Sequence, residues 1–136
     1  MALVYRTGRD LSITVNSVTY NNVCQSATLS VEPNVVTGET IGQRYRKHID
    51  RTATLTMDIT QDWGSTSPNS IAKILADAYL TAPDTSLAFS MACGGVTISG
   101  KVFPAMPEMG GSATDVLTTT VALEVDLTGA NTLTIA

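Results

Sequence analysis

Residues 51–60 have the sequence RTATLTMDIT, in which apolar and polar side chains alternate without a break after Arg51. Successive side chains of a β-strand point to opposite faces, so this alternation predicts a strand with one buried and one solvated face. The apolar face would consist of Ala53, Leu55, Met57 and Ile59. We therefore expect the chain to fold around a β-sheet that covers an apolar core on one side.

Alternating segments also occur on both sides of this strand. Residues 26–32 alternate until Pro33, which lacks the N–H group needed within a central ladder and so predicts the end of that strand. Residues 117–126 repeat the pattern near the C-terminus. The polar faces of the three predicted strands carry Thr, Ser and acidic residues, but no Lys or Arg.

Two short hairpins are predicted from their turn residues. Residues 12–19 alternate but are interrupted by Asn16-Ser17, and residues 87–102 are interrupted by Gly94-Gly95. Asn and Gly readily adopt the backbone conformations that two-residue hairpin turns require. Gly100, within the later hairpin, predicts a β-bulge.

One helix is predicted, over about Pro68–Leu80. Ser67 is a favourable N-cap, Pro68 is a favourable first helical residue, and Ala82-Pro83 ends the segment. The apolar positions recur every three or four residues and form one stripe: Ile71, Ile74, Leu75 and Ala78.

Together these elements predict a mainly β fold of about seven to eight strands. It would be a β-sandwich or half-open barrel with one flanking helix and a long loop between two strands. A chain of 136 residues is one domain by length. Residues 1–136 would then comprise a short N-terminal arm, the long loop at residues 33–50 and a C-terminal tail at residues 127–136. The last residues, TLTIA, could add an edge strand to a neighbouring sheet.

The composition argues against several classes of protein. Charged residues make up 15% of the chain and its net charge is −4, which disfavours nucleic-acid binding as the main role. The N-terminal sequence MALVYRTGRD lacks the continuous apolar segment of a signal peptide, and no apolar run approaches the length of a membrane span. We expect an intracellular chain with no membrane contact, in which Cys24 and Cys93 are reduced and largely buried.

The basic residues gather in the long loop. Four of the eight Lys and Arg residues lie in residues 44–51, together with Tyr45 and the single histidine, His48. Three interpretations remain open: a solvated loop tip, a contact with nucleic acid, or a protein–protein contact. The acidic surplus elsewhere would give a second copy of the chain a complementary surface. The candidate contact residues are Arg44, Tyr45, Arg46, Lys47, His48 and Arg51.

The sequence does not support catalysis or metal binding. His48 has no nucleophile motif or Gly-rich phosphate loop to work with, and Gly94-Gly95 and Gly110-Gly111 are typical turn glycines. Two separated cysteines and one histidine form no recognisable ligand spacing. Asp62-Trp63 is interpreted as the end of a strand with an anchoring Trp. We therefore predict no catalytic residues, no metal and no cofactor.

The second half of the chain resembles a known family. The order of Trp63-Gly64, the helix SIAKILADAYL and the segment GGVTISGKVFPAMPEMGGSATDVLTTTVALEVD is similar to that of the major tail tube proteins of long-tailed bacteriophages. The layout of a strand, a long loop and a strand over residues 26–60 also matches. After Asp126 the chain continues as Leu-Thr-Gly and a tail that has no counterpart in the pattern.

The resemblance implies a structural role in the virion. In that family a β-sandwich or barrel with a flanking helix forms six-membered rings by sharing strands, and the rings stack into a tube. The tube holds the tape measure protein and later conducts DNA into the cell. The long loop reaches a neighbouring subunit or ring, so residues 33–50 are expected to serve assembly. The expected partners are copies of the same chain, the tape measure protein and other tail proteins, and DNA that passes without specific binding.

The polar strand faces then become candidates for the lining of the tube, although they could equally be exterior faces. The candidates are Thr28, Ser30, Glu32, Thr54, Thr56, Asp58, Thr120 and Glu124. Hydroxyl groups and acids would hold DNA phosphates only loosely.

A tail tube subunit, assembled in the host cytoplasm and located in the virion, is the first expectation. Another ring-forming tail protein, such as a tail-completion protein or the tube of a contractile tail, is the nearest alternative. A monomeric β-sandwich module for adhesion or carbohydrate binding is the alternative from a different class.

Overall fold

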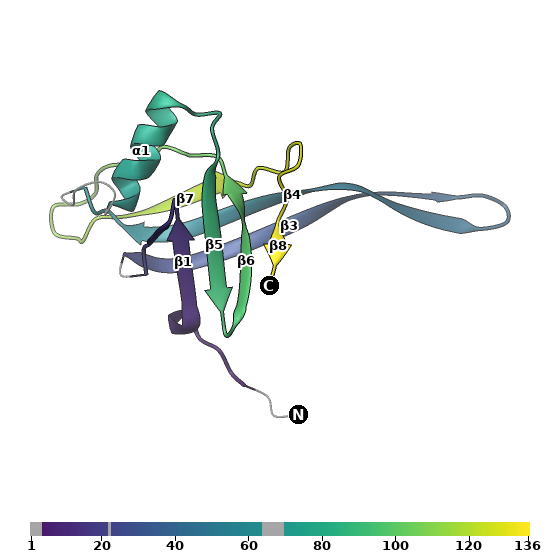
Figure 1. The fold of residues 1–136 in the computed structure, drawn as a ribbon, viewed down its shortest axis with the longest axis horizontal. Coiled ribbons are helices and arrows are strands. Elements are labelled where there is room, and N and C mark those ends of the chain that lie inside the picture. The colour runs from purple at the N-terminus through teal and green to yellow at the C-terminus, as the bar shows by residue number, and fades with distance from the viewer. Residues whose placement is uncertain (1–3, 22, 64–69) are drawn as a thin grey trace.

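The computed structural model describes residues 4–21, 23–63 and 70–136 of the chain. Within these residues the chain forms eight strands and one α-helix, which confirms the predicted mainly β fold (Figure 1). A 3-10 helix at Gly8–Asp10 precedes the first strand. The elements are β1 Leu11–Val15, β2 Val18–Thr19, β3 Cys24–Glu39, β4 Arg44–Thr60, α1 Ile71–Thr81, β5 Leu87–Cys93, β6 Val96–Val102, β7 Thr118–Glu124 and β8 Thr134–Ile135.

The strands form two antiparallel sheets that face one another. The five-stranded sheet has the order β2-β1-β5-β6-β8, and the three-stranded sheet has the order β3-β4-β7. The strands of the two sheets cross at a steep angle (Figure 1). The sheets meet at one corner, where Val102 bridges Val125 and the Phe103 amide donates to the Glu124 carbonyl at 2.9 Å. The sandwich is therefore half-open, as predicted.

The predicted apolar face of β4 forms the centre of the core. Ala53, Leu55, Met57 and Ile59 are each at most 2% exposed. Leu55 pairs with Leu29 of β3 on one side and with Leu123 of β7 on the other. The opposite wall of the core comes from the five-stranded sheet and the helix, through Ile13, Val15, Phe89, Val102, Ile71, Ile74 and Leu75.

Helix α1 begins later than the sequence indicates. Its N-cap is Ser70, whose hydroxyl accepts from the Lys73 amide at 3.1 Å. Asp62 accepts from the Ile71 and Ala72 amides, which are among the unpaired N–H groups of the first turn. The predicted N-cap Ser67 and first helical residue Pro68 lie outside the described residues. A distant carboxylate therefore caps the helix in addition to the local serine.

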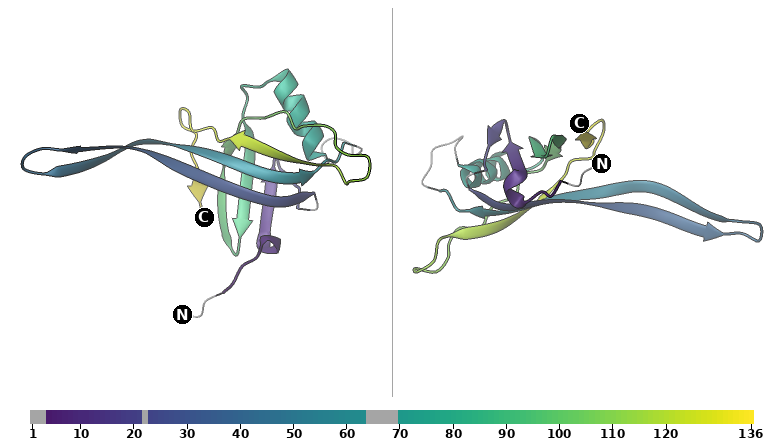
Figure 2. Two further views of the ribbon diagram at one scale, coloured as in Figure 1. Left: turned by 180° about the vertical axis from the view of Figure 1, so that it is seen from behind. Right: turned by 90° about the horizontal axis from the view of Figure 1, so that it is seen from below.

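The predicted long loop at residues 33–50 is instead a β-hairpin, so that expectation was wrong. Strands β3 and β4 stay paired from Pro33 opposite Arg51 to Glu39 opposite Arg44, and only residues 40–43 connect them. The hairpin projects beyond the sandwich (Figures 1 and 2). Pro33 does not end β3, because β3 is an edge strand and a proline there need not donate to a ladder. Alternation fails here because the protein buries neither face of this hairpin.

Both short hairpins have the turns that the sequence predicts, but Gly100 does not form the predicted bulge. Asn16 and Ser17 have positive φ in the β1–β2 turn, and Gly94 and Gly95 do so in the β5–β6 turn. Gly100 was wrongly expected to form a bulge: it pairs in register with Phe89. A Cβ at this position would lie 3.0 Å from Leu133 and 3.2 Å from Phe89, so the glycine admits side chains that pack over the strand.

The C-terminal strand β8 pairs with β6, through Ile98 opposite Ile135, and so adds an edge strand to the five-stranded sheet, as expected. One further expectation needs correction. Cys24 and Cys93 are free thiols, as expected, but they are half-buried rather than largely buried. Burial raises the pKa of the Cys24 thiol, and the thiol donates a hydrogen bond to the Ser26 carbonyl at 3.2 Å.

Candidate assembly surfaces

The hairpin of residues 33–51, here called the basic hairpin, has almost no contact with the core. Apart from Val35 and Gly38, which are half-buried, its residues are all exposed. The strand of residues 44–51 reaches roughly 20 Å from the sandwich. An isolated two-stranded ribbon is marginally stable in water. The basic hairpin is therefore a surface suited to stabilisation by a partner.

A β-bulge separates the candidate contact residues onto two faces. Asn34 pairs with Asp50, but the next pair is Val35 with His48, so Ile49 is the extra residue. Paired residues lie on the same face of a ladder. One face beyond the bulge therefore carries Arg44, Arg46 and His48, and the other carries Tyr45 and Lys47. The basic hairpin presents positive charge on both sides instead of one patch.

The tip of the basic hairpin combines apolar and charged groups. Ile41 is fully exposed in the turn, and Tyr45 is 49% exposed. The Tyr45 ring lies over Gly38, where an added Cβ would overlap its hydroxyl and ring carbons. Arg44 and Glu39 form an ion pair at 2.5 Å, but both side chains are largely exposed, so the pair stabilises the tip little. Large apolar and aromatic groups beside arginines are typical of protein interfaces.

The base of the basic hairpin is joined to the C-terminal segment. Arg51 donates from Nη2 to the Thr132 hydroxyl at 3.3 Å. Asp126 holds that segment in place, since its carboxylate accepts from the Thr128 amide at 3.0 Å and from the Asn131 side chain at 3.0 Å. Asp126 is the last residue of the segment 117–126, whose alternation would place it on the polar face, but it is only 5% exposed and does not lie there. Arg51 therefore has a partner within its own chain.

Replacing Asp126 with Asn is expected to destabilise the protein in a pH-dependent manner. The Thr128 hydroxyl, followed by the Thr128 amide, lowers the pKa of Asp126 below its ordinary value of 3.8, and burial opposes this effect. Because the folded-state pKa is the lower one, the carboxylate stabilises the fold above that ordinary value, and this contribution is lost as pH falls below it. Urea unfolding from about pH 7 to pH 3 should show a gap between the wild-type and Asp126→Asn midpoints that narrows at the acidic end. A gap that stays constant or widens would contradict this account.

The predicted polar faces lie together on the outside of the three-stranded sheet. We call this surface the polar face. Strand register brings Thr28 beside Thr56 and Thr54 beside Glu124. Its residues are half-buried or exposed, and they include every candidate lining residue: Thr28, Ser30, Glu32, Thr54, Thr56, Asp58, Thr120 and Glu124. The alternation in the sequence therefore predicted this surface correctly, although it gave no indication of what the surface contacts.

Asp58 organises the centre of the polar face. Thr120 donates its hydroxyl to one carboxylate oxygen at 2.5 Å, and Ser26 donates to the other at 2.9 Å. These bonds, that from Thr120 first, lower the pKa of Asp58, against an opposing effect of burial. The carboxylate therefore stays charged at neutral pH, and it ties β3, β4 and β7 together across the face.

Both edges of the three-stranded sheet belong to strands that pair with β4 alone among the described residues. These are β3, with 16 residues, and β7, with seven. An unpaired strand edge carries N–H and C=O groups that can pair with another chain. The polar face thus lies on a sheet that further copies could extend on either side.

The loop between β6 and β7, residues 103–117, is here called the distal loop. It lies at the end of the three-stranded sheet opposite the basic hairpin (Figures 1 and 2). Gln61 anchors it: its side chain donates to the carbonyls of Gly110 and Thr118 at 2.9 Å and accepts from the Gly110 amide at 3.1 Å. Trp63 donates to the same Gln61 side chain at 3.0 Å. This role of Gln61 was not predicted, because no local pattern in the sequence links residues 49 positions apart.

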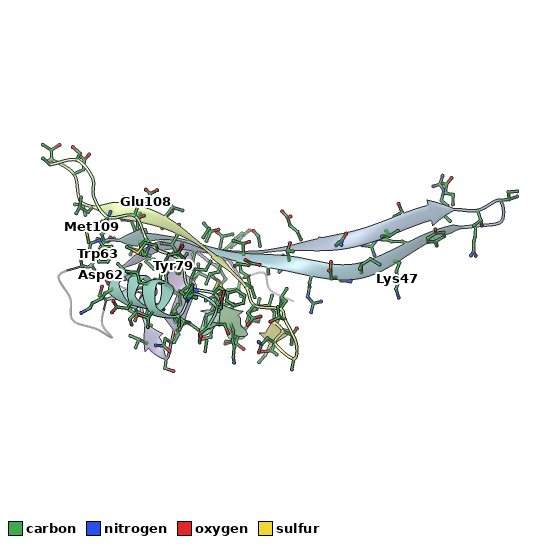
Figure 3. The ribbon with its side chains drawn as sticks, turned by 90° about the horizontal axis from the view of Figure 1, so that it is seen from above. Lys47, Asp62, Trp63, Tyr79, Glu108 and Met109 are labelled. Atoms are coloured by element: carbon green, nitrogen blue, oxygen red, sulfur yellow. The ribbon has the colours of Figure 1, made fainter. Side chains whose placement is uncertain are left out.

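The described residues offer no assembled catalytic or metal site. His48 is exposed on the basic hairpin, away from the core. Among residues 4–21, 23–63 and 70–136, no group of three His, Cys, Asp or Glu side chains could hold a metal ion. In the same part of the chain, no helix has the length and apolar character needed to cross a membrane. Asp62, just after the end of β4, caps α1 beside Trp63 (Figure 3).

Comparison with known proteins identifies the fold. No family model and no curated protein matches the sequence. A chain in the virion of a native gene transfer agent particle aligns over 96% of this chain and 99% of its own, with a TM-score of 0.71 and 14% identity. A chain in the tail of an empty gene transfer agent particle, refined with C6 symmetry, aligns over the same shares with a TM-score of 0.69 and 13% identity. A chain in the six-fold symmetrised baseplate of the anti-feeding prophage covers 100% of this chain and 97% of its own, with a TM-score of 0.61 and 14% identity. At these identities the likeness establishes a shared fold over essentially the whole chain.

Proposed function

We propose that the chain is a structural subunit of a phage-type tail tube. Six copies form a ring, and rings stack into a hollow tube with the polar face lining its channel. The observation that carries the proposal is the three-stranded sheet: it is apolar and buried on one side and polar on the other. Its outer strands β3 and β7 each pair with β4 alone among the described residues, apart from the Glu124 carbonyl at the end of β7, which accepts from the Phe103 amide. Neighbouring copies can extend such a sheet around a ring. Six-fold symmetry in the assemblies that contain chains of the same fold supports the ring.

The chemistry of the polar face suits a passage for DNA. Its Thr and Ser hydroxyls make weak, non-specific contacts, and Glu32, Asp58 and Glu124 repel phosphate. A channel lined with Lys or Arg would hold DNA by neutralising its phosphates. The tube would enclose the tape measure protein during assembly in the host cytoplasm, contact other tail proteins at its ends, and remain in the virion without catalysing a reaction.

The basic hairpin serves as the contact to a neighbouring copy in this proposal. It projects away from the sandwich (Figure 1) and carries exposed apolar and basic side chains, above all Arg44, Tyr45, Arg46, Lys47 and His48. A head-to-tail contact of this kind is heterologous, so it can propagate along an axis without closing. The same property turns a ring into a tube.

The lining of the channel is tested by replacing Thr54 and Thr56 with Lys in the particle that carries the protein. We expect particles of normal yield whose infectivity falls by about tenfold or more, because six copies would place a band of cations against the DNA phosphates. The control Thr54→Gln/Thr56→Gln adds similar bulk without charge and should stay close to wild type. Normal infectivity of the lysine variant would exclude the polar face as the channel lining.

A single ring in a baseplate or tail-completion complex is the second candidate. The likeness to a chain of the anti-feeding prophage baseplate favours it. The two candidates differ in assembly, since a tube subunit polymerises into filaments whereas a baseplate subunit stops at one ring. An adhesion or carbohydrate-binding module fits less well, because Trp63 is half-buried and bonded to Gln61 instead of forming an exposed aromatic platform.

A further inference from the structure

We propose that the distal loop of one copy is the docking surface for the basic hairpin of a copy in the next ring. This inference rests on the proposed tube function and specifies which surface receives the basic hairpin. The occupant is a second copy of this chain, and the two surfaces match in position, charge and exposed apolar area.

The position of the two surfaces suits a head-to-tail contact. Strand β4 joins them: it starts in the basic hairpin at Arg44, and it ends at Thr60, which pairs with Thr118 at the exit of the distal loop. Its 17 residues span roughly 55 Å. Figure 3 shows Glu108 and Met109 at one end of the molecule and Lys47 on the projecting hairpin at the other. A copy displaced along this direction brings a basic hairpin to a distal loop.

The charges of the two surfaces are opposite. The basic hairpin holds four basic side chains against two acidic ones, for a net charge of +2 over residues 33–51. The distal loop holds Glu108 and Asp115 and no Lys or Arg, for a net charge of −2 over residues 103–117. Within the basic hairpin, Glu39 already compensates Arg44. Arg46 and Lys47 are therefore the cations available to a partner.

Both surfaces also expose apolar side chains that the monomer leaves in water. In the distal loop, Met109 is 67% exposed and Val116 is 75% exposed, and Met106 and Leu117 are exposed as well. In the basic hairpin the corresponding residues are Val36, Ile41, Tyr45 and Ile49. Methionine side chains adapt to irregular contacts. Burial of the apolar side chains of the distal loop against those of the basic hairpin would supply affinity. The opposite charges would fix how the two surfaces are oriented and aligned.

The distal loop is ordered in advance for a contact. Gln61 joins Gly110 to the end of β4 by the paired hydrogen bonds described above. Leu117 lies against Gly111, where an added Cβ would come within 2.6 Å of it, and the Asp115 amide donates to the Ser112 carbonyl at 3.2 Å. A loop held in this way loses less conformational entropy when a partner arrives.

Exchange of charges between the two surfaces tests the inference. The variants are Arg46→Glu/Lys47→Glu, Glu108→Lys/Asp115→Lys and the four-fold combination, and the readout is the protein concentration needed for tubes by electron microscopy and sedimentation. Each double variant should raise that concentration by about tenfold or more, because like charges then face one another across the contact. The combination restores opposite charges and should bring the concentration back to within about threefold of wild type.

A charge reversal of the same size on the polar face serves as the control, because it changes the net charge equally but at a different surface. Glu32→Lys/Glu124→Lys also adds four units of positive charge, but it should not rescue the Arg46→Glu/Lys47→Glu variant. Two results would overturn this inference and leave the proposed function standing. In the first, Glu108→Lys/Asp115→Lys forms tubes at the same concentration as the wild type. In the second, Glu32→Lys/Glu124→Lys restores assembly of the Arg46→Glu/Lys47→Glu variant and Glu108→Lys/Asp115→Lys does not. A wild-type protein that forms neither rings nor tubes would overturn both.

Discussion

Reversal of charge in the basic hairpin, by Arg44→Glu/Arg46→Glu/Lys47→Glu, is expected to abolish assembly into tubes and leave folded monomers or single rings. The three side chains are exposed and lie outside the core, so their replacement removes no packing. The change converts a basic projection into an acidic one on a chain whose net charge is already −4. Juxtaposed like charges cost several kcal/mol at an interface, and each ring would repeat that cost in every subunit.

Sedimentation velocity and negative-stain electron microscopy at the same concentration measure this effect. Far-ultraviolet circular dichroism and the urea midpoint of the variant should match those of the wild type, which separates lost assembly from lost folding. Lys73→Glu, an exposed reversal on α1, is the control and should assemble normally. Tubes of normal length from the triple variant would refute an assembly role for the basic hairpin.

Leu55→Ala is expected to lower the free energy of unfolding by about 2–5 kcal/mol. Leu55 is fully buried at the centre of β4, between Leu29 and Leu123, so truncation leaves a cavity that neighbouring strands cannot easily fill. A loss of this size is a large part of the total stability of a typical domain, about 5–15 kcal/mol. Urea denaturation of the wild type and the variant at neutral pH gives the difference directly.

Val36→Ala provides the comparison for the core variant. Val36 lies on the same pair of strands, but in the basic hairpin, where it is 49% exposed. Its truncation should change the free energy of unfolding by less than about 0.5 kcal/mol. Equal losses at Leu55 and Val36 would mean that the basic hairpin packs into the monomer core, contrary to the structure.

The sequence predicted those parts of the fold in which burial or turn chemistry acts locally. The part of β4 from Ala53 to Ile59 could be predicted because one face of the strand is buried and the other is solvated, so apolar and polar residues alternate along it. The turns at Asn16-Ser17 and Gly94-Gly95 were clear because their positive φ favours those residues. The residues of the polar face were predicted in the same way, because polar side chains occupy every second position of each strand.

The sequence predicted poorly where stability comes from distant residues or from outside the chain. The basic hairpin has no buried face, so Pro33 and the mixed side chains after it suggested a loop although the backbone stays paired. Asp126 looked like a surface residue because its partners, Thr128 and Asn131, lie in a tail without strand pattern. Gln61 anchors Gly110 from 49 residues away. None of these contacts leaves a periodic signal.

Electron cryomicroscopy of the purified protein at rising concentration tests the central claim most directly. The account predicts hollow tubes of stacked six-membered rings in which the three-stranded sheet lines the channel, with Thr54 and Thr56 facing the lumen. It also predicts that each basic hairpin reaches a copy in the adjacent ring. Compact monomers at every concentration, or tubes with Thr54 and Thr56 on their outer wall, would contradict it.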